Sequence, residues 1–152
     1  MKIDLNQIKE LRELTGAGVM DVRRALEESD GDQKKALLVL KKKGAEVAEK
    51  KKERATGAGL LEAYVHNGGK VVAVAELLCE TDFVARNEEF KTLAHEIAMQ
   101  VASMNPKNTE ELLKQEYIRD ASKTITDLVN ELIGKIRENI KINRFQRFEL
   151  GE

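Results

Sequence analysis

The chain has 152 residues, enough for one domain or two small ones, and 41% of them are hydrophobic, which is sufficient for a core. Charged residues reach 35% but nearly cancel to a formal net charge of -1, which argues against a protein that binds nucleic acid through bulk positive charge. The lone cysteine, Cys79, and the lack of a hydrophobic leader suggest a cytoplasmic protein, and no apolar run approaches the ~20 residues of a membrane span.

Residues 1–44 are predicted to form a module of three short helices. Asp4 and Gln7 stand where a capping box would start the first helix, Asp32 can cap the third, and Gly44 is its expected end. Apolar residues recur at helical spacing, among them Leu5, Ile8, Leu11, Val22, Ala25, Leu26, Ala36, Leu37 and Leu40. The resulting bundle resembles the ubiquitin-associated fold, with Thr15–Gly18 in the place of that fold's first loop.

Residues 45–57 are predicted to be a helical linker. Lys50, Lys51, Lys52 and Arg54 form a basic run, but glutamates interrupt it. Alternating signs of charge are typical of a solvated helix face rather than of a phosphate-binding surface.

Residues 58–152 are predicted to form an α+β core and dimerisation domain, with a small antiparallel three-stranded sheet packed against helices. The segment 58–80 is expected to be a hairpin that turns at Asn67-Gly68-Gly69. Its second strand is apolar on both faces and should be central and covered on both sides. Helices are expected from Glu88 and over residues 109–139, and a third strand over residues 140–150.

A charged residue and a large aromatic residue stand side by side where the second strand ends, in the stretch Thr81-Asp82-Phe83-Val84. Strand-to-helix junctions lie at the rim of a sheet, where loops carry function on a rigid scaffold. The stretch is therefore a candidate binding segment. The alternative is that Phe83 is a core residue and Asp82 a helix cap, since both roles are common for these residue types.

Residue groupings suited to catalysis or metal binding are missing from the sequence. His66 and His95 lie far apart, and neither has a cysteine or carboxylate at zinc-ligand spacing. Gly16-Ala17-Gly18 is not a nucleotide loop, because no Gly-Lys-Ser/Thr follows it. By elimination the sequence predicts a binding protein that is not an enzyme and uses no metal or cofactor.

Two stretches taken together resemble the signatures of the bacterial elongation factor Ts family. They are Glu10-Leu11-Arg12-Glu13-Leu14-Thr15-Gly16-Ala17-Gly18-Val19-Met20-Asp21 and Cys79-Glu80-Thr81-Asp82-Phe83-Val84-Ala85-Arg86-Asn87. The segments Ile136-Arg137-Glu138-Asn139-Ile140 and Arg147-Phe148-Glu149-Leu150-Gly151 are similar to the family's closing segment. The resemblance covers the whole chain and implies a short form with one core module where longer relatives have two.

This resemblance implies a guanine-nucleotide exchange factor for elongation factor Tu, the GTPase that delivers aminoacyl-tRNA to the ribosome. In the family, the N-terminal module docks on the partner's nucleotide domain. Arg12 and Met20 match its docking residues, and Val19 occupies a third docking position. Val19 stands where the family often has methionine. The family's Thr-Asp-Phe-Val segment, here Thr81–Val84, enters near the partner's Mg²⁺ and nucleotide and helps to dislodge the metal.

A homodimer is also expected, because three strands leave open edges and faces that invite pairing, and short relatives of this family work as homodimers. No membrane and no direct nucleic-acid partner is expected. Two alternatives remain open from the residues alone. One is a generic protein-binding module, including a ubiquitin binder, and the other is an RNA-binding protein that uses residues 41–54.

Overall fold

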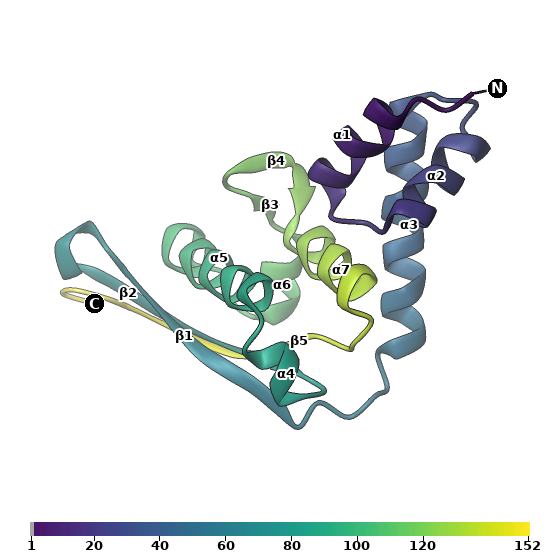
Figure 1. Cartoon of the computed structure of the whole chain (residues 1–152). Helices are drawn as coiled ribbons and strands as arrows, with labels where there is room; N and C mark the ends of the chain where they lie inside the picture. Colours follow the sequence, from purple (N-terminus) through teal and green to yellow (C-terminus); the bar gives the residue numbers. More distant parts are fainter. Residues whose placement is uncertain (1) are drawn as a thin grey trace. The chain divides into compact units, whose positions relative to one another are not determined.

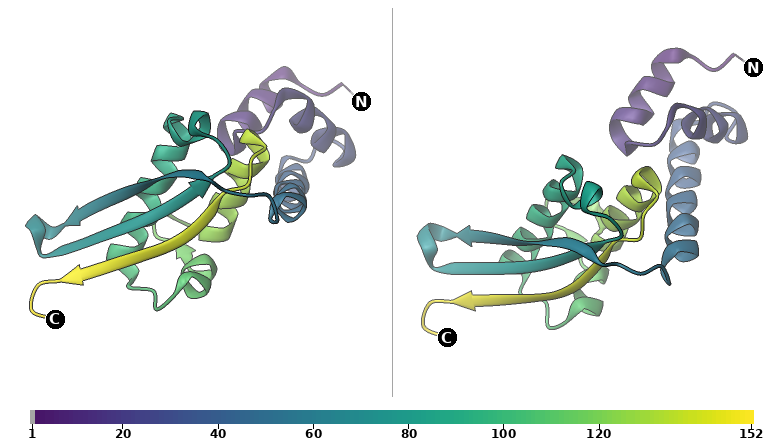
Figure 2. Two further views of the ribbon diagram at one scale, coloured as in Figure 1. Left: turned by 90° about the horizontal axis from the view of Figure 1, so that it is seen from below. Right: turned by 60° about the horizontal axis from the view of Figure 1, so that its bottom comes forward.

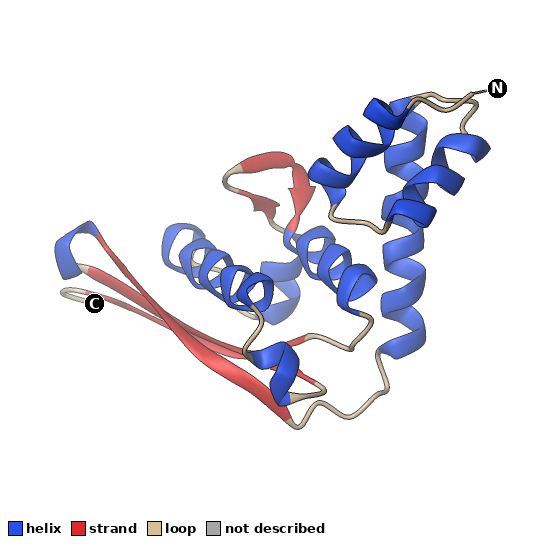
Figure 3. Cartoon of the chain, in the orientation of Figure 1, coloured by secondary structure: helices blue, strands red, loops and turns tan. Residues whose placement is uncertain are grey.

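The computed structural model describes residues 2–152, and Figure 1 shows the order of its helices and strands. The chain divides into two compact units, which are Met1–Lys52 with Asn130–Arg137 and Glu53–Val129 with Glu138–Glu152. We call them the helical unit and the sheet unit. The helical bundle and the small antiparallel sheet with its helices confirm the predicted α+β class (Figure 3). No helix within residues 2–152 combines the length and the apolar character that crossing a membrane requires.

The helical unit begins as its capping residues predict. The Asp4 side chain and Gln7 form the capping box, and the Asp32 side chain accepts a hydrogen bond from a backbone amide at the start of the third helix. Gly16 adopts a left-handed conformation with φ 68° and ends the first helix. The three helices are α1 Leu5–Thr15, α2 Val19–Glu28 and α3 Gln33–Lys51. Their shared core consists of Ile8, Leu11, Val22, Ala25, Leu26, Ala36 and Leu40.

Gly44 does not end α3, which continues to Lys51, so that prediction was wrong. A Cβ atom on Gly44 would lie 3.3 Å from the backbone oxygen of Asn130. Asn130 belongs to α7, Ile125–Ile136, whose second half is part of the helical unit. Gly44 therefore lets two helix backbones approach closely, which is a long-range role that the sequence of α3 does not reveal.

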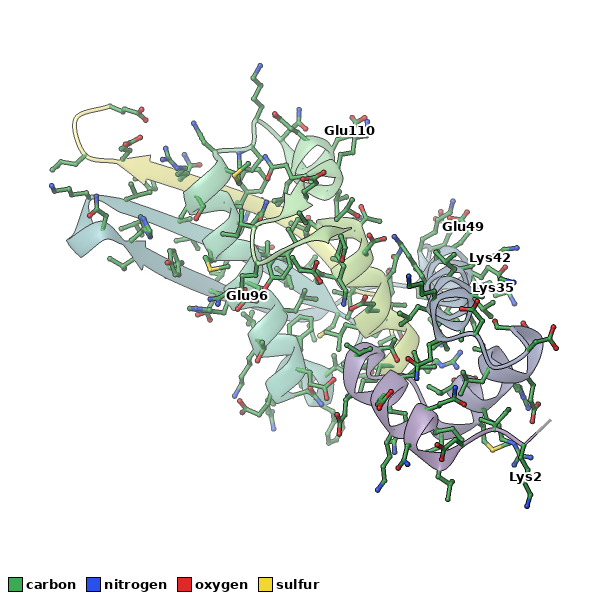
Figure 4. All side chains as sticks on the ribbon, turned by 90° about the horizontal axis from the view of Figure 1, so that it is seen from above. Lys2, Lys35, Lys42, Glu49, Glu96 and Glu110 are labelled. Atoms are coloured by element: carbon green, nitrogen blue, oxygen red, sulfur yellow. The ribbon has the colours of Figure 1, made fainter. Side chains whose placement is uncertain are left out.

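The end of α3 and the residues that follow it carry solvated charges, some of them in ion pairs. Lys42 and Glu49, seven residues apart, lie on the exposed face of the helix (Figure 4). Lys52 Nζ lies 2.6 Å from Glu49 Oε1, and Arg54 Nε lies 3.3 Å from Glu80 Oε1. Two cations of the basic run are thus already paired with carboxylates of the chain.

The sheet unit is built on an antiparallel sheet in the order β1-β2-β5. Its strands are β1 Ala58–His66, β2 Val71–Cys79 and β5 Lys141–Glu149. The predicted hairpin, its turn over Asn67–Gly69, the central place of β2 and the third strand are all confirmed. At Asn67 and Gly68 the backbone takes φ 53° and 66°, which suits these two residue types.

Only one face of β2 is fully covered, so the expectation of cover on both sides was wrong. Its inward residues are Val71, Ala73, Ala75, Leu77 and Cys79, and all are buried. Its alternate residues are only half-buried. Seen from below in Figure 2, the strands lie in front and the helices of the sheet unit lie behind them. We call the uncovered side the outer face.

The covering helix α5, Glu88–Met104, starts at the predicted cap Asn87, whose side chain accepts from the amide nitrogens of Glu89 and Phe90. It ends at Asn105, which is left-handed with φ 46°. Its buried side includes the predicted residues Phe90, Leu93, Ile97 and Val101, while Met104, at its last turn, is exposed. This helix closes the sheet's inner core.

A helical stretch over residues 109–139 was predicted, and the structure confirms a helix in its first part and in its second half but not between them. The segment contains α6 Thr109–Lys114, a hairpin of β3 Glu116–Tyr117 and β4 Asp120–Thr124, and then α7. Gln100, fully buried on α5, donates to the Glu116 carbonyl at 3.0 Å and accepts from the Ile118 amide at 3.1 Å. A buried amide side chain needs hydrogen-bond partners. Here it finds them in backbone groups of the hairpin, which a continuous helix would have used for its own hydrogen bonds.

Candidate functional site

The candidate binding segment folds as one short helical turn directly after β2. The helix α4, Asp82–Ala85, begins at Thr81, whose extended backbone has φ -129° and ψ 155°. The Thr81 Oγ1 atom accepts a hydrogen bond from the Val84 amide at 3.4 Å. Thr81 is therefore the cap and Asp82 the first residue of the turn, so the alternative that Asp82 caps a helix was wrong.

The turn buries one apolar side chain and exposes another. Val84 is 8% exposed and anchors α4 in the sheet unit, whereas Phe83 is 86% exposed. The alternative that Phe83 belongs to the core was therefore wrong. Burial of a phenylalanine contributes about 1.5–3 kcal/mol, and the fold forgoes this stabilisation at Phe83. An aromatic side chain with this exposure is available to a partner, and aromatic residues are enriched at protein interfaces.

Glu138, just after α7 and far along the chain, holds the start of this turn. Its Oε1 accepts hydrogen bonds from the Glu80 amide at 3.1 Å and the Thr81 amide at 3.0 Å. Its Oε2 accepts from the Thr81 hydroxyl at 2.8 Å. Sequence reasoning missed this residue, because no local pattern links Glu138 to a segment 57 residues earlier.

A second set of contacts fixes the backbone around Glu138. The neighbouring Asn139, 6% exposed, donates from its amide nitrogen to Glu80 Oε1 at 2.9 Å and from Nδ2 to the Arg54 carbonyl at 2.9 Å. Glu80 also pairs with Arg54. The end of β2 and the chain before β5 are thus tied together from both sides.

The Cys79 thiol closes the buried side of the same junction. It is fully buried and donates a hydrogen bond to the Thr81 carbonyl at 3.2 Å. Burial, with the Glu138 carboxylate as a second cause, raises the pKa of the Cys79 thiol above its ordinary value. The thiol therefore stays protonated at neutral pH and serves the junction as a hydrogen-bond donor.

In the helical unit, the docking residues expected from the resemblance flank one loop. The Thr15 hydroxyl donates to the Leu11 carbonyl at 2.6 Å and accepts from the Ala17 amide at 3.2 Å, which shapes the turn between α1 and α2. Val19 is 46% and Met20 57% exposed, and Arg12 is exposed on α1.

The exposed Leu14 joins these residues at the end of α1, and sequence reasoning missed it. Arg12, Leu14, Val19 and Met20 flank the same loop, and we call them the loop patch. Its apolar members and one arginine are the residue types typical of a protein contact.

The two histidines lie near Tyr64 rather than at the candidate segment. The Tyr64 hydroxyl lies 3.2 Å from His66 Nδ1, and His95 Nδ1 lies 3.3 Å from Glu62 Oε1. Within residues 2–152, no three histidine, cysteine or acidic side chains are grouped so that they could hold a metal ion. The site offers an exposed anchor and a held backbone, which suits binding.

Comparison with known proteins gives the same family over the whole chain. A family model described as "Elongation factor TS" matches residues 80–152. The elongation factor Ts of Thermotoga neapolitana is 43% identical over 195 aligned positions, which cover 100% of this chain and 99% of the relative. That of Pseudothermotoga lettingae is 42% identical with full coverage of both, and that of Caldanaerobacter subterraneus is 41% identical with coverage of 99% and 98%.

These alignments are longer than the 152 residues of this chain, so the relatives carry residues within the matched region that this chain lacks. The family match includes the Thr81 turn, Glu138 and all of β5. The identity of more than two-fifths, maintained over nearly the whole length of each relative, shows that the chain belongs to the elongation factor Ts family.

Proposed function

We propose that this chain is a guanine-nucleotide exchange factor for elongation factor Tu and acts in translation elongation. The observation that carries the proposal is Phe83, which is 86% exposed on a turn whose first residue is held by Glu138. A large rigid side chain in this setting costs the free protein stabilisation but can act as an anchor in a complex. Membership of the elongation factor Ts family supports this role.

In the proposed mechanism, Phe83 enters the partner near its Mg²⁺ and nucleotide. Mg²⁺ demands near-ideal octahedral coordination by oxygen ligands, so a small displacement of those ligands weakens the metal site. Asp82 is exposed beside Phe83 and would bring a carboxylate that can accept hydrogen bonds from partner backbone. Thr81 and Val84 would hold the turn, one as its cap and the other as its buried anchor.

The loop patch would supply the docking contact. Arg12, Val19 and Met20 would bind the partner's nucleotide domain, and Leu14 extends the apolar part of that surface. The chain would use no cofactor and no covalent chemistry, because exchange needs only tighter binding to the nucleotide-free partner. By linkage, the nucleotide and the exchange factor then weaken each other's binding by the same factor.

We also propose that the protein is a homodimer that pairs through the outer face of the sheet. Val65, Val72 and Phe148 are aligned across the three strands on that face. Val65 and Phe148 are each 62% exposed. A second copy would cover this apolar row, and a two-fold axis would apply the same surface to itself.

Release of labelled GDP from purified elongation factor Tu tests the function directly. The rate should rise with the concentration of this chain and then saturate, and an unchanged rate would contradict the proposal. RNA binding through residues 41–54 is the other candidate, and it is disfavoured because Lys52 and Arg54 already pair with carboxylates. Binding to RNA that weakens steeply with salt would favour that candidate instead.

A further inference from the structure

We infer that Glu138 is a positioning residue that sets the direction of Phe83, an inference that rests on the proposed exchange function. Glu138 does not belong to the turn, yet both of its carboxylate oxygens accept hydrogen bonds from the start of the turn. Oε1 accepts the Glu80 and Thr81 amides, and Oε2 accepts the Thr81 hydroxyl. Bonds to an ionised acceptor are about twice as strong as neutral ones.

The contact with the Thr81 hydroxyl also organises the turn itself. A threonine hydroxyl has one proton and two lone pairs. Donation of that proton to Glu138 Oε2 fixes the orientation of the hydroxyl, and the Val84 amide donates to a lone pair of Thr81 Oγ1 at 3.4 Å. The hydrogen bonds therefore run from Glu138 through Thr81 to Val84, and Phe83 lies between Thr81 and Val84 in the sequence.

Phe83 depends on this support because its own side chain has little packing. It is 86% exposed, so the backbone on either side is what fixes the direction of its Cα–Cβ bond. Val84 holds the C-terminal side by burial, and Glu138 holds the N-terminal side by hydrogen bonds. An anchor that is already aimed correctly loses less entropy when it binds.

Glu138→Ala in the full chain tests the inference. The maximal rate of GDP release at saturating exchange factor should fall by about tenfold, because small misplacement of a binding group is costly. The half-saturating concentration should change less than about twofold, since the loop patch still docks. Mere loss of folded protein would do the opposite, because it lowers the active concentration and leaves the maximal rate unchanged.

Glu96→Gln is a matched control, because Glu96 on α5, labelled in Figure 4, is also a half-buried glutamate with two partners. It accepts from the Tyr117 hydroxyl and pairs with Arg119 Nε at 2.8 Å. This variant should keep the wild-type maximal rate. In a Phe83→Ala background, Glu138→Ala should cause little further loss, since the group that it positions is gone.

A wild-type maximal rate for Glu138→Ala would overturn the positioning role of Glu138. So would a loss of maximal rate from Glu138→Ala that is as large in the Phe83→Ala background as in the wild type. Either result would leave the proposed exchange function standing. If the alanine variant does not fold, Glu138→Asp decides, because it keeps the charge but withdraws the carboxylate from Thr81. A wild-type maximal rate for that variant would likewise overturn the positioning role. A wild-type chain without any effect on GDP release would instead refute the exchange function, and the role of Glu138 with it.

Discussion

Gly44 of α3 and Gly134 of α7 face each other within the helical unit, and a Cβ atom on Gly134 would lie only 3.4 Å from the Cα of Gly44. On the other side, a Cβ on Gly44 would lie 3.3 Å from the Asn130 carbonyl oxygen, which is backbone and cannot rotate away. The two helices are therefore in backbone contact, and the size of residue 44 limits how closely they pack.

Gly44→Leu should destabilise the protein by about 1–3 kcal/mol, as overpacking typically does. Gly44→Ala should change stability little, because a gain of up to about 1 kcal/mol in helix propensity opposes the tight contact. Urea unfolding measures both changes. Ala45→Leu, at an exposed position of the same helix, is the control and should be nearly neutral. A Gly44→Leu variant as stable as this control would show that the helices do not need the glycine.

Phe83→Ala should leave the free energy of unfolding within about 0.5 kcal/mol of wild type, because the side chain is exposed. It should weaken the complex with nucleotide-free elongation factor Tu by roughly 2–4 kcal/mol, as loss of a buried anchor does. Phe90→Ala is the contrasting change, since Phe90 is fully buried, and it should cost about 3–5 kcal/mol of stability. Denaturant unfolding and GDP-release kinetics on the same samples separate the two effects. Normal exchange by folded Phe83→Ala would remove Phe83 from the site.

Local signals predicted most of the fold. The caps at Asp4, Asp32 and Asn87 and the turn at Asn67–Gly69 depend on hydrogen bonds and dihedral angles within a few residues, so the sequence displays them. The predicted segment at Phe83 does lie at a strand-to-helix junction, with the aromatic ring exposed.

Three of the errors and omissions involve partners far away in the sequence. Gly44 is needed by α7, the backbone at Glu116 is bound by Gln100, and Thr81 is held by Glu138. Composition and periodicity describe what a segment prefers alone. They do not report which distant side chain will satisfy its backbone, and that choice decided these three places.

Arg12→Ala should weaken binding to elongation factor Tu by roughly 1–2 kcal/mol, because arginine is often an anchor at protein interfaces. Arg12 is exposed, so thermal stability should hardly change. Arg23→Ala is a suitable control, as Arg23 is exposed on α2 and forms a surface ion pair with Glu27 at 3.0 Å. Titration of labelled partner measures both affinities. Equal affinity of Arg12→Ala and wild type for the partner would show that Arg12 does not contribute to docking.

Asp21→Asn should lower stability by about 1 kcal/mol at neutral pH, as expected for a partly exposed ion pair. The hydrogen bond from Lys43, aided by the charges of Lys43, Arg137 and Arg24, holds the pKa of Asp21 below its ordinary 3.8. A lowered carboxyl pKa contributes stability that is present above the unfolded-state pKa and is lost as pH falls through the folded-state value.

The difference between wild type and Asp21→Asn should therefore persist down to about pH 4 and shrink at lower pH. Unfolding curves at several pH values measure it. A difference that is constant through the acidic range would mean that the Asp21 charge contributes nothing. Lys43→Ala should overlap with Asp21→Asn rather than add to it, because both variants remove the same contact.

Wild-type protein should sediment at micromolar concentration with twice its chain mass of 17.1 kDa. Val65→Lys should shift it towards the monomer, because the change puts a charge into the apolar row of the outer face. Leu38→Lys, at a position of the helical unit that is 66% exposed, should stay dimeric. A wild-type species of 17.1 kDa alone would refute the dimer.

The hydrogen bonds from Glu138 to the amides of Glu80 and Thr81 span 58 and 57 residues. During synthesis, the ribosome therefore exports Phe83 well before the residue that supports its turn has been made. The strand β5, which pairs with β2, is made later still, from Lys141 onwards. A nascent chain that has not yet reached Glu138 lacks the hydrogen bonds that hold the start of the Phe83 turn. The support of this turn is therefore completed only after Phe83 itself has been synthesised.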